Sequence, residues 1–300
     1  MQVRFGYNPS KPIPSIWRVN QMVHIITDTT ACVSSEYARQ HNLPVIPQIV
    51  TFGEESFYEG IELDQSGFLE RLRKASQLPK TAAPPPELFR AEFERLVPLG
   101  EPILCVHPST HVSGTVRSAE VAAQDFPEAD IRVIDTRLVA GPLMSLVMKA
   151  VAWAEDGLDI DTIQTRILDL IPRCHIYFLV DTLEYLARGG RIGAASALLG
   201  SLLQVKPILT LQDGVVTPYE KQRTHQRAVM RLVEIVREQY PDTGDGCPVV
   251  MHAGAPQEAA RLVEHLTGCL QVQEIPIVDL PPAIVVHAGP GILAVSFIDG

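Results

Sequence analysis

One stretch of the sequence constrains the fold more than any other, because a buried strand, a turn and a helix follow one another directly in it. Residues 102–106 form a short apolar run of the kind found in buried strands. Beyond the turn, Val116, Ala119, Ala123 and Phe126 recur at steps of three or four residues, the period of an amphipathic helix. The stretch therefore predicts that a buried strand leads the chain to the N-terminus of a helix.

The turn between this strand and helix is rich in groups that bind anions. Ser109, Thr110, Ser113 and Thr115 supply hydroxyl donors, and Gly114 lets a ligand approach the backbone. The helix N-terminus adds unpaired N–H groups and the positive end of the helix dipole. Two interpretations are open at this point: an anion site, or a helix that Ser113 or Thr115 simply caps.

The rest of the first half repeats the alternation of strands and helices. We expect further strands at 23–27, 45–50 and 131–135, and helices at 64–76, 87–96, 141–153 and 161–170. Such alternation is typical of a parallel sheet covered on both faces. Ligands of these sheets lie at the carboxyl ends of the strands, where we expect Asp28, Thr81 and Ser113.

The pattern changes beyond residue 175. We expect a strand at 176–180, a helix at 194–203 and a hairpin with strands at 207–211 and 215–219. Beyond the hairpin we expect two helices, at 225–240 and 256–266, and four strands, at 248–252, 270–275, 283–287 and 292–298. We therefore predict an α/β protein of two α/β domains. An extension at 1–21 precedes an N-terminal domain at 22–175 with a largely parallel sheet. The C-terminal domain at 176–300 has a mixed or antiparallel sheet with helices on both faces.

Composition excludes several classes of function. Lys and Arg number 25 against 35 Asp and Glu, and the net charge of −10 argues against a nucleic-acid partner. The five cysteines are widely spaced without a C-x-x-C pair, so neither a disulfide framework nor a zinc ribbon is expected. No signal sequence and no run of about 18 apolar residues is found, so we expect a cytoplasmic protein without stable membrane insertion.

Catalysis by Ser113 is one hypothesis, because nucleophilic serines of many hydrolases lie in a strand–turn–helix. The G-x-S-x-G pattern is missing, however, and a base would have to be His111, His287 or another histidine. Asp28 follows an apolar run at a strand end, but no paired-acid or histidine spacing supports a metal site. No metal and no cofactor are therefore expected.

Two further residues are candidates for an anion site. Arg191 follows Gly189 and Gly190, which let the backbone turn sharply and direct the guanidinium inward. His287 ends the apolar run 283–286, which we interpret as a strand. Together with the Ser113 hydroxyl, these side chains could accept a carboxylate or a phosphate.

Seven short motifs occur in an order that is specific although each motif alone is weak. They are Asp28-Thr29-Thr30, Thr81-Ala82-Ala83-Pro84, Ser109-Thr110-His111-Val112-Ser113-Gly114-Thr115, Asp181-Thr182-Leu183-Glu184-Tyr185-Leu186, Arg188-Gly189-Gly190-Arg191-Ile192, Lys206-Pro207-Ile208-Leu209 and His287-Ala288-Gly289-Pro290-Gly291. Over about residues 22–297 the chain resembles the DegV family of bacterial fatty-acid-binding proteins. Its departures are Ala82 where the family usually has serine, Thr29 in place of serine, and Val116 in place of an aromatic residue.

The resemblance implies a long-chain fatty acid between the two domains, and an ATP-dependent fatty acid kinase subunit that phosphorylates it to an acyl-phosphate for phospholipid synthesis. The protein itself would then be a lipid-binding carrier and not an enzyme. Carried over, Thr81 and Ser113 contact the carboxylate, Gly114 and Thr115 form the turn, and Arg191 and His287 complete the polar network. Asp28, Thr29, Ser109 and Thr110 are secondary candidates, and Leu198, Leu199, Leu202 and Leu203 are candidates for the tunnel wall or for plain core.

Physical reasoning agrees with a lipid ligand. A carboxylate buried without partners costs several kcal/mol, so it needs a cluster of donors. Each buried CH₂ of the tail contributes roughly 0.8 kcal/mol, so the tail supplies most of the affinity. The alternatives are a small-substrate enzyme, either a serine hydrolase or a relative of the dihydroxyacetone kinase fold acting on a phosphorylated or hydroxy-ketone substrate, and a regulatory lipid sensor without a kinase.

Overall fold

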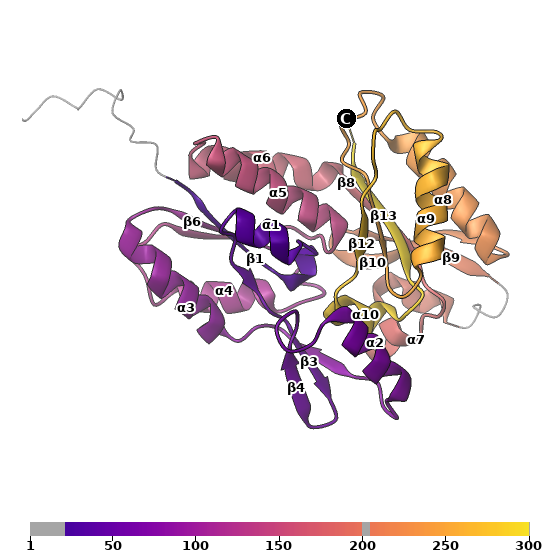
Figure 1. The fold of residues 1–300 in the computed structure, drawn as a ribbon, viewed down its shortest axis with the longest axis horizontal. Helices are drawn as coiled ribbons and strands as arrows, with labels where there is room; N and C mark the ends of the chain where they lie inside the picture. Colours follow the sequence, from indigo (N-terminus) through magenta and orange to yellow (C-terminus); the bar gives the residue numbers. More distant parts are fainter. Residues whose placement is uncertain (1–21, 200–204, 300) are drawn as a thin grey trace, which may run out of the picture.

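The computed structural model describes residues 22–199 and 205–299, and the predicted extension at 1–21 lies outside them. Figure 1 shows the N-terminal and C-terminal halves side by side, each built on its own sheet. The predicted α/β class is confirmed, with a parallel sheet in the first half and a mixed sheet in the second. Among the described residues, no helix is both long and apolar enough to cross a membrane.

The parallel sheet brings the ends of two strands to one edge. Its order is β2 (Val45–Ile46), β1 (His24–Asp28), β6 (Ile103–His107) and β7 (Ile131–Asp135). Ile26 and Cys105 point to one face, and Ile25 and Leu104 to the other, as the two-residue period of a strand requires. The strands are therefore buried on both faces, and their carboxyl ends present the next residues to the second half.

Helices cover both faces of this sheet. One face packs on α3 (Pro86–Leu96) and α4 (Thr115–Ala123), and the other on α1 (Ser35–Gln40), α5 (Gly141–Glu155) and α6 (Ile160–Leu170). Ser34 caps α1, accepting from the N–H of Tyr37, as the hydroxyl before a helix predicts. At α4 the N-cap residue is Gly114, which has no side chain, and Ser113 Oγ accepts from the N–H of Thr115, the first helical residue, at 3.3 Å.

The mixed sheet is antiparallel except at one edge. Its order is β10 (Val215–Gln222), β9 (Lys206–Gln212), β8 (Cys174–Leu179), β13 (Leu293–Ile298), β11 (Val249–His252) and β12 (Ile277–Asp279), with only the β11–β12 pair parallel within the described residues. Helices α8 (His225–Gln239) and α9 (Pro256–Thr267) cover its outer face. Its inner face packs on α7 (Glu184–Arg188) and α10 (Pro282–Ala288), on the side that carries the cavity described below.

The predicted strand at 45–50 is wrong as a single element. Residues 45–46 form β2, whereas β3 (Ile49–Phe52) belongs to a small antiparallel sheet with β4 (Glu55–Tyr58) and β5 (Lys80–Ala82). Pro47 lacks the N–H that a continuous ladder needs, so the chain changes sheets there. The small sheet and α2 (Gln65–Lys74) pack against α10, and Thr81 lies in β5, not at a strand end of the parallel sheet.

The largest error concerns residues 283–287, which form most of helix α10 instead of a strand. The run Ala283-Ile284-Val285-Val286 has the composition of a strand, but Pro282 at the first helical position favours a helix. Because the run is buried on almost all sides, it shows no polar face with a helical period. The strand expected at 270–275 is also wrong, since the short strand of this region is Ile277–Asp279.

The helix expected at 194–203 is described only in part. Residues Gly193–Leu198 form the 3₁₀ helix η5, and 200–203, including Leu202 and Leu203, lie outside the described residues. Leu198 is buried in the core of the second half, and Leu199 is exposed. The change from one sheet to the other falls between β7 and β8, but α5 packs against both sheets. The domain boundary at 175 remains a prediction.

Candidate functional site

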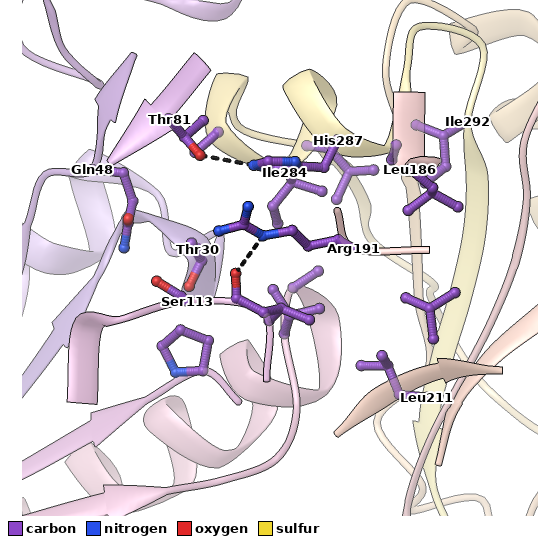
Figure 2. Close-up of a pocket in the computed structure, with 18 of the residues that line it drawn as sticks. Thr30, Gln48, Thr81, Ser113, Leu186, Arg191, Leu211, Ile284, His287 and Ile292 are labelled. Atoms are coloured by element: carbon purple, nitrogen blue, oxygen red, sulfur yellow. Dashed lines mark hydrogen bonds between the residues drawn. The ribbon is translucent and has the colours of Figure 1, made fainter. Parts of the chain in front are cut away.

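A cavity lies between the carboxyl edge of the parallel sheet and the inner face of the mixed sheet. Figure 2 shows that its polar side chains gather at one end and its apolar side chains at the other. The cavity is therefore shaped for a molecule that is itself polar at one end only.

The polar end combines residues from both halves of the chain. They are Thr30, Gln48, Thr81 and Ser113 from the first half, and Arg191 and His287 from the second. Ser113 and Gly114 lie in the turn after β6, where the parallel sheet ends. The turn predicted to bind an anion thus faces the loop after α7 and the end of α10.

The apolar end lies on the mixed sheet. Alternate residues Ile176 and Phe178 of β8 point to its inner face, and Ala294 of β13 lies beside them. Further apolar residues of this wall come from the β9–β10 hairpin, α7, α10 and the residue before β13, namely Leu211, Val216, Leu186, Ala283, Ile284, Ala288 and Ile292. The other apolar residues that line the cavity are Ala83, Pro108, Val112, Val139 and Ala140 of the first half, and Leu280 before α10. This wall can bury an aliphatic chain without leaving a polar group unpaired.

Helix α10 explains how His287 reaches the site. Positions 283, 284, 287 and 288 lie on one face of a helix, and all four line the cavity. His287 Nε2 is 2.7 Å from Thr81 Oγ1, which joins the small sheet to α10. Burial, and secondarily the charge of Arg191, lowers the pKa of His287 to about 4, so the imidazole is neutral at pH 7.

Gly189 is required for this position of His287. A Cβ at residue 189 would lie 2.1 Å from His287 Nδ1, closer than any real contact allows. The absence of a side chain therefore lets α7 and α10 approach each other. Nδ1 itself is buried and has no hydrogen-bond partner within the described part of the chain.

Arg191 connects the two halves at the polar end. Its Nε donates to the carbonyl oxygen of Val112 at 3.0 Å, and its Nη1 donates to the carbonyl of Gly189 at 2.7 Å. These bonds fix the guanidinium beside the turn that holds Ser113, as Figure 2 shows. Arg191 thereby brings a positive charge to the cavity while its hydrogen bonds hold the turn in place.

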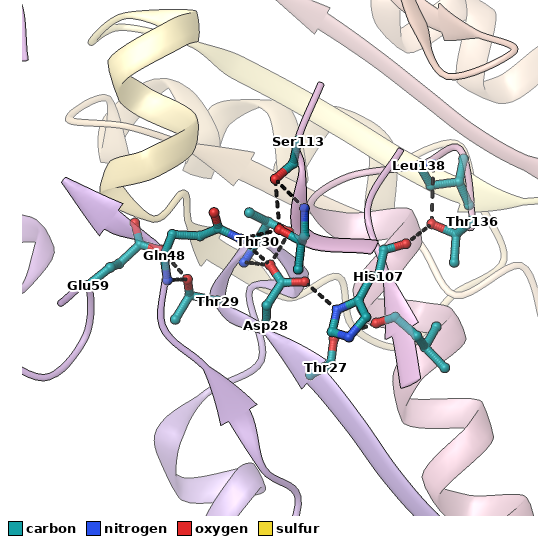
Figure 3. Close-up of polar contacts among 12 residues, drawn as sticks. Thr27, Asp28, Thr29, Thr30, Gln48, Glu59, His107, Ser113, Thr136 and Leu138 are labelled. Atoms are coloured by element: carbon teal, nitrogen blue, oxygen red, sulfur yellow. Dashed lines mark hydrogen bonds and ion pairs between the residues drawn. The ribbon is translucent and has the colours of Figure 1, made fainter. Parts of the chain in front are cut away.

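Behind Ser113 lies a buried polar network (Figure 3). Ser113 Oγ is 2.7 Å from Thr115 Oγ1, which accepts from Gln48 Nε2 at 2.9 Å. The same nitrogen of Gln48 donates to Asp28 Oδ1 at 3.0 Å, and the other oxygen of Asp28 is 2.7 Å from His107 Nδ1. This network anchors the polar end of the cavity to the ends of β1 and β6.

The site residues predicted from the sequence fall into two groups. Thr81, Ser113, Gly114, Arg191 and His287 line the cavity together. The others lie outside its wall: Thr115 and Asp28 are in the buried network, Thr29 donates to Glu59, Ser109 donates to the carbonyl of Gly214, and Thr110 donates to Asp135. The cavity-lining group is thus assembled from segments more than 200 positions apart, while their role toward a ligand remains a prediction.

Comparisons with known proteins agree with this geometry. A family model described as an uncharacterised protein of the DegV family matches residues 22–300. A DegV domain-containing protein of Streptomyces coelicolor is 36% identical over 282 residues, covering 92% of this chain and 98% of that protein. The chain belongs to the DegV family.

Solved structures of DegV proteins have the same fold. One is described as showing fatty acid binding of a DegV family protein from Thermus thermophilus, with a TM-score of 0.86 and 27% identity over 93% of this chain and all of that one. Another is a stearic-acid-binding protein from Eubacterium ventriosum, with a TM-score of 0.84 and 25% identity over 93% of this chain and 98% of that one. Both proteins are similar to this chain over almost its whole described length.

Sequence reasoning missed Gln48 and Thr30 as lining residues. Gln48 is a polar residue within the apolar run 45–50, directly after Pro47, and this interruption was a usable signal. Thr30 was part of a recognised motif but was not assigned to the site. For the hydrolase hypothesis, the observed partner of Ser113 Oγ is Thr115, and no described histidine forms a hydrogen bond with Ser113.

Proposed function

We propose that the protein binds a long-chain fatty acid in this cavity, with the carboxylate at the polar end and the tail on the mixed sheet. The observation that carries the proposal is the separation of polar and apolar walls within one cavity. A fatty acid has the same separation, so each part of the ligand meets a matching surface. The stearic acid named for the Eubacterium ventriosum relative supports a ligand of this length.

The energetics of such a complex are favourable at both ends. Arg191, Ser113 and Thr81 offer hydrogen bonds to the carboxylate, and bonds to a charged group contribute about 1.5–3 kcal/mol each. About ten buried methylene groups would contribute about 8 kcal/mol. By these figures the two ends contribute comparable amounts, and the polar end also determines which way the molecule lies.

We further propose that the protein is a cytoplasmic carrier that presents the carboxylate to an ATP-dependent fatty acid kinase subunit. Ser113 is half-buried and Gly114 is exposed, so a partner could reach the carboxylate at this end. The kinase would transfer the γ-phosphoryl group of ATP to a carboxylate oxygen, giving an acyl-phosphate and ADP. This step is implied by the family resemblance and needs no catalytic group of the carrier.

Native mass spectrometry of the gently purified protein tests the binding proposal. We expect an adduct with the mass of a long-chain fatty acid, or the appearance of one after incubation with palmitic or stearic acid. The double variant Thr81→Ala, Ser113→Ala should weaken binding of the acid much more than binding of the alcohol of equal length. The exposed hydroxyl pair of Thr51 and Ser56, changed to alanines, is the matched control.

Two results would overturn the proposal. Failure to find or load any fatty acid would remove the ligand, and equal losses for acid and alcohol would place the head group elsewhere. The carrier role is tested by incubating the loaded protein with a candidate kinase and ATP, and trapping the acyl-phosphate with hydroxylamine. Labelling of Ser113 by a fluorophosphonate would instead favour the hydrolase.

A further inference from the structure

In the hydrogen bonds behind Ser113, donors and acceptors can be assigned by starting from Asp28. As a carboxylate, Asp28 can only accept, and its Oδ1 accepts from the N–H of Thr30 at 3.0 Å and from the Thr30 hydroxyl at 2.6 Å. Gln48 meets the same oxygen with its side-chain amide. Because an acceptor must face a donor, the nitrogen of that amide, and not its oxygen, lies toward Asp28.

The same assignment of donors and acceptors extends from Gln48 to Ser113. Gln48 Nε2 uses one hydrogen for Asp28 and the other for Thr115 Oγ1, which is fully buried. The hydrogen of this buried hydroxyl needs an acceptor. Of the two described atoms that contact Thr115 Oγ1, Gln48 Nε2 is a donor, so the hydrogen is directed to Ser113 Oγ at 2.7 Å. Ser113 Oγ also accepts weakly from the N–H of Thr115 at 3.3 Å. The hydrogen of Ser113 therefore points away from the network and into the cavity that Ser113 lines.

We propose that the series of hydrogen bonds from Asp28 through Gln48 and Thr115 fixes Ser113 as a hydrogen-bond donor toward the ligand. Gln48 and Thr115 are then positioning residues that make the site select head groups that only accept hydrogen bonds, such as an ionised carboxylate. This inference deepens the proposed function and rests on it. It also accounts for a buried glutamine at a break between two strands, a place where an apolar residue would otherwise be expected.

The first test removes the hydrogen bonds of the Thr115 side chain without adding a charge. Thr115→Val keeps the shape of the side chain but can neither accept from Gln48 nor donate to Ser113, whereas Thr115→Ser keeps the hydroxyl. We expect Thr115→Val to weaken binding of stearic acid about tenfold and binding of stearyl alcohol less than about twofold, because bonds to charged groups are the stronger ones. Thr115→Ser should restore the acid-to-alcohol ratio of the unchanged protein.

The second test reverses the donor and acceptor roles in this series of hydrogen bonds by a substitution at Gln48. In Gln48→Glu, the new carboxyl shares a proton with Asp28 and offers an acceptor to Thr115, so Thr115 no longer donates to Ser113. Ser113 would then donate to Thr115 and present its lone pairs to the cavity. We expect stearic acid to lose more than about tenfold in affinity while stearyl alcohol keeps or gains affinity. If this variant does not fold, the two Thr115 variants decide the question alone.

The matched control is Thr110→Val. Thr110 lies in the same turn, and its exposed hydroxyl donates to Asp135, which is not part of this series of hydrogen bonds. This control should leave both affinities unchanged. An unchanged acid-to-alcohol ratio in Thr115→Val, with normal binding of stearic acid by the unchanged protein, overturns the inference but not the proposed function. If the unchanged protein binds no fatty acid, both are overturned.

Discussion

Glu59 gives the structure a pH dependence that can be worked out from its surroundings. The side chain is only 2% exposed, and it accepts hydrogen bonds from the Thr29 hydroxyl and from the N–H of Ala283 at the start of α10. It therefore connects the end of β1 to the helix that carries His287. Burial raises the pKa of Glu59 from 4.5 to about 7, the two hydrogen bonds oppose this, and the charge of Asp28 adds a smaller increase.

The sign of the effect follows from this raised pKa. Below pH 4.5 the carboxyl of Glu59 is protonated in both the folded and the unfolded chain, so it causes no difference. Between pH 4.5 and about 7 the unfolded chain loses the proton while the folded chain keeps it, and stability falls as pH rises. At about 1.4 kcal/mol per pH unit, the free energy of unfolding is lower by about 3 kcal/mol above pH 7.

Urea unfolding at a series of pH values between 4 and 8 measures this effect. Glu59→Gln keeps an acceptor for the N–H of Ala283, replaces the oxygen that faces the Thr29 hydroxyl by an NH₂ group, and does not titrate. Relative to the unchanged protein, it should gain about 3 kcal/mol between pH 4.5 and 8. Glu62→Gln, at an exposed position that accepts from the N–H of Tyr58, should show no such gain. A parallel pH dependence for Glu59→Gln and the unchanged protein would refute the reasoning.

Two further predictions concern the polar end of the cavity. In histidine NMR titrations His287 should have a pKa of about 4, and Arg191→Gln should raise it, because a nearby positive charge is removed; a lower pKa in the variant would contradict this. Gly189→Ala should displace His287 from Thr81 and weaken fatty acid binding in a titration, because its Cβ has no space. Gly190→Ala meets no atom within 4 Å and should cost only about 1 kcal/mol of stability for its positive φ, with binding retained.

The part of the site that the sequence predicted follows from local pattern. The strand at 103–106 and the helix after Gly114 have clear periods, and parallel strands end at one edge of their sheet. That rule correctly placed Asp28 and the Ser113 turn at the same edge. The family motifs named Arg191 and His287, and the cavity contains both residues.

The part that the sequence did not predict depends on long-range packing. Gln48 reaches the cavity because the chain leaves the parallel sheet at Pro47 and starts a different sheet, and only the folded chain reveals that change of partner. His287 was assigned to a strand because a short, apolar, β-branched run has no visible helical period. Its correct element matters, since the helix places Ile284 and His287 on the same face.

The charges at the polar end discriminate between the possible ligands. Among the described residues that line the cavity, Arg191 is the one that is charged at pH 7, because His287 is neutral there. A carboxylate carries one negative charge, so a single guanidinium balances it. A phosphate monoester carries about −1.5 to −2 and would remain partly uncompensated in a buried site. A small phosphorylated substrate would also leave the apolar wall of Ile176, Phe178 and Leu211 uncovered, so both ends of the cavity favour a fatty acid over that alternative.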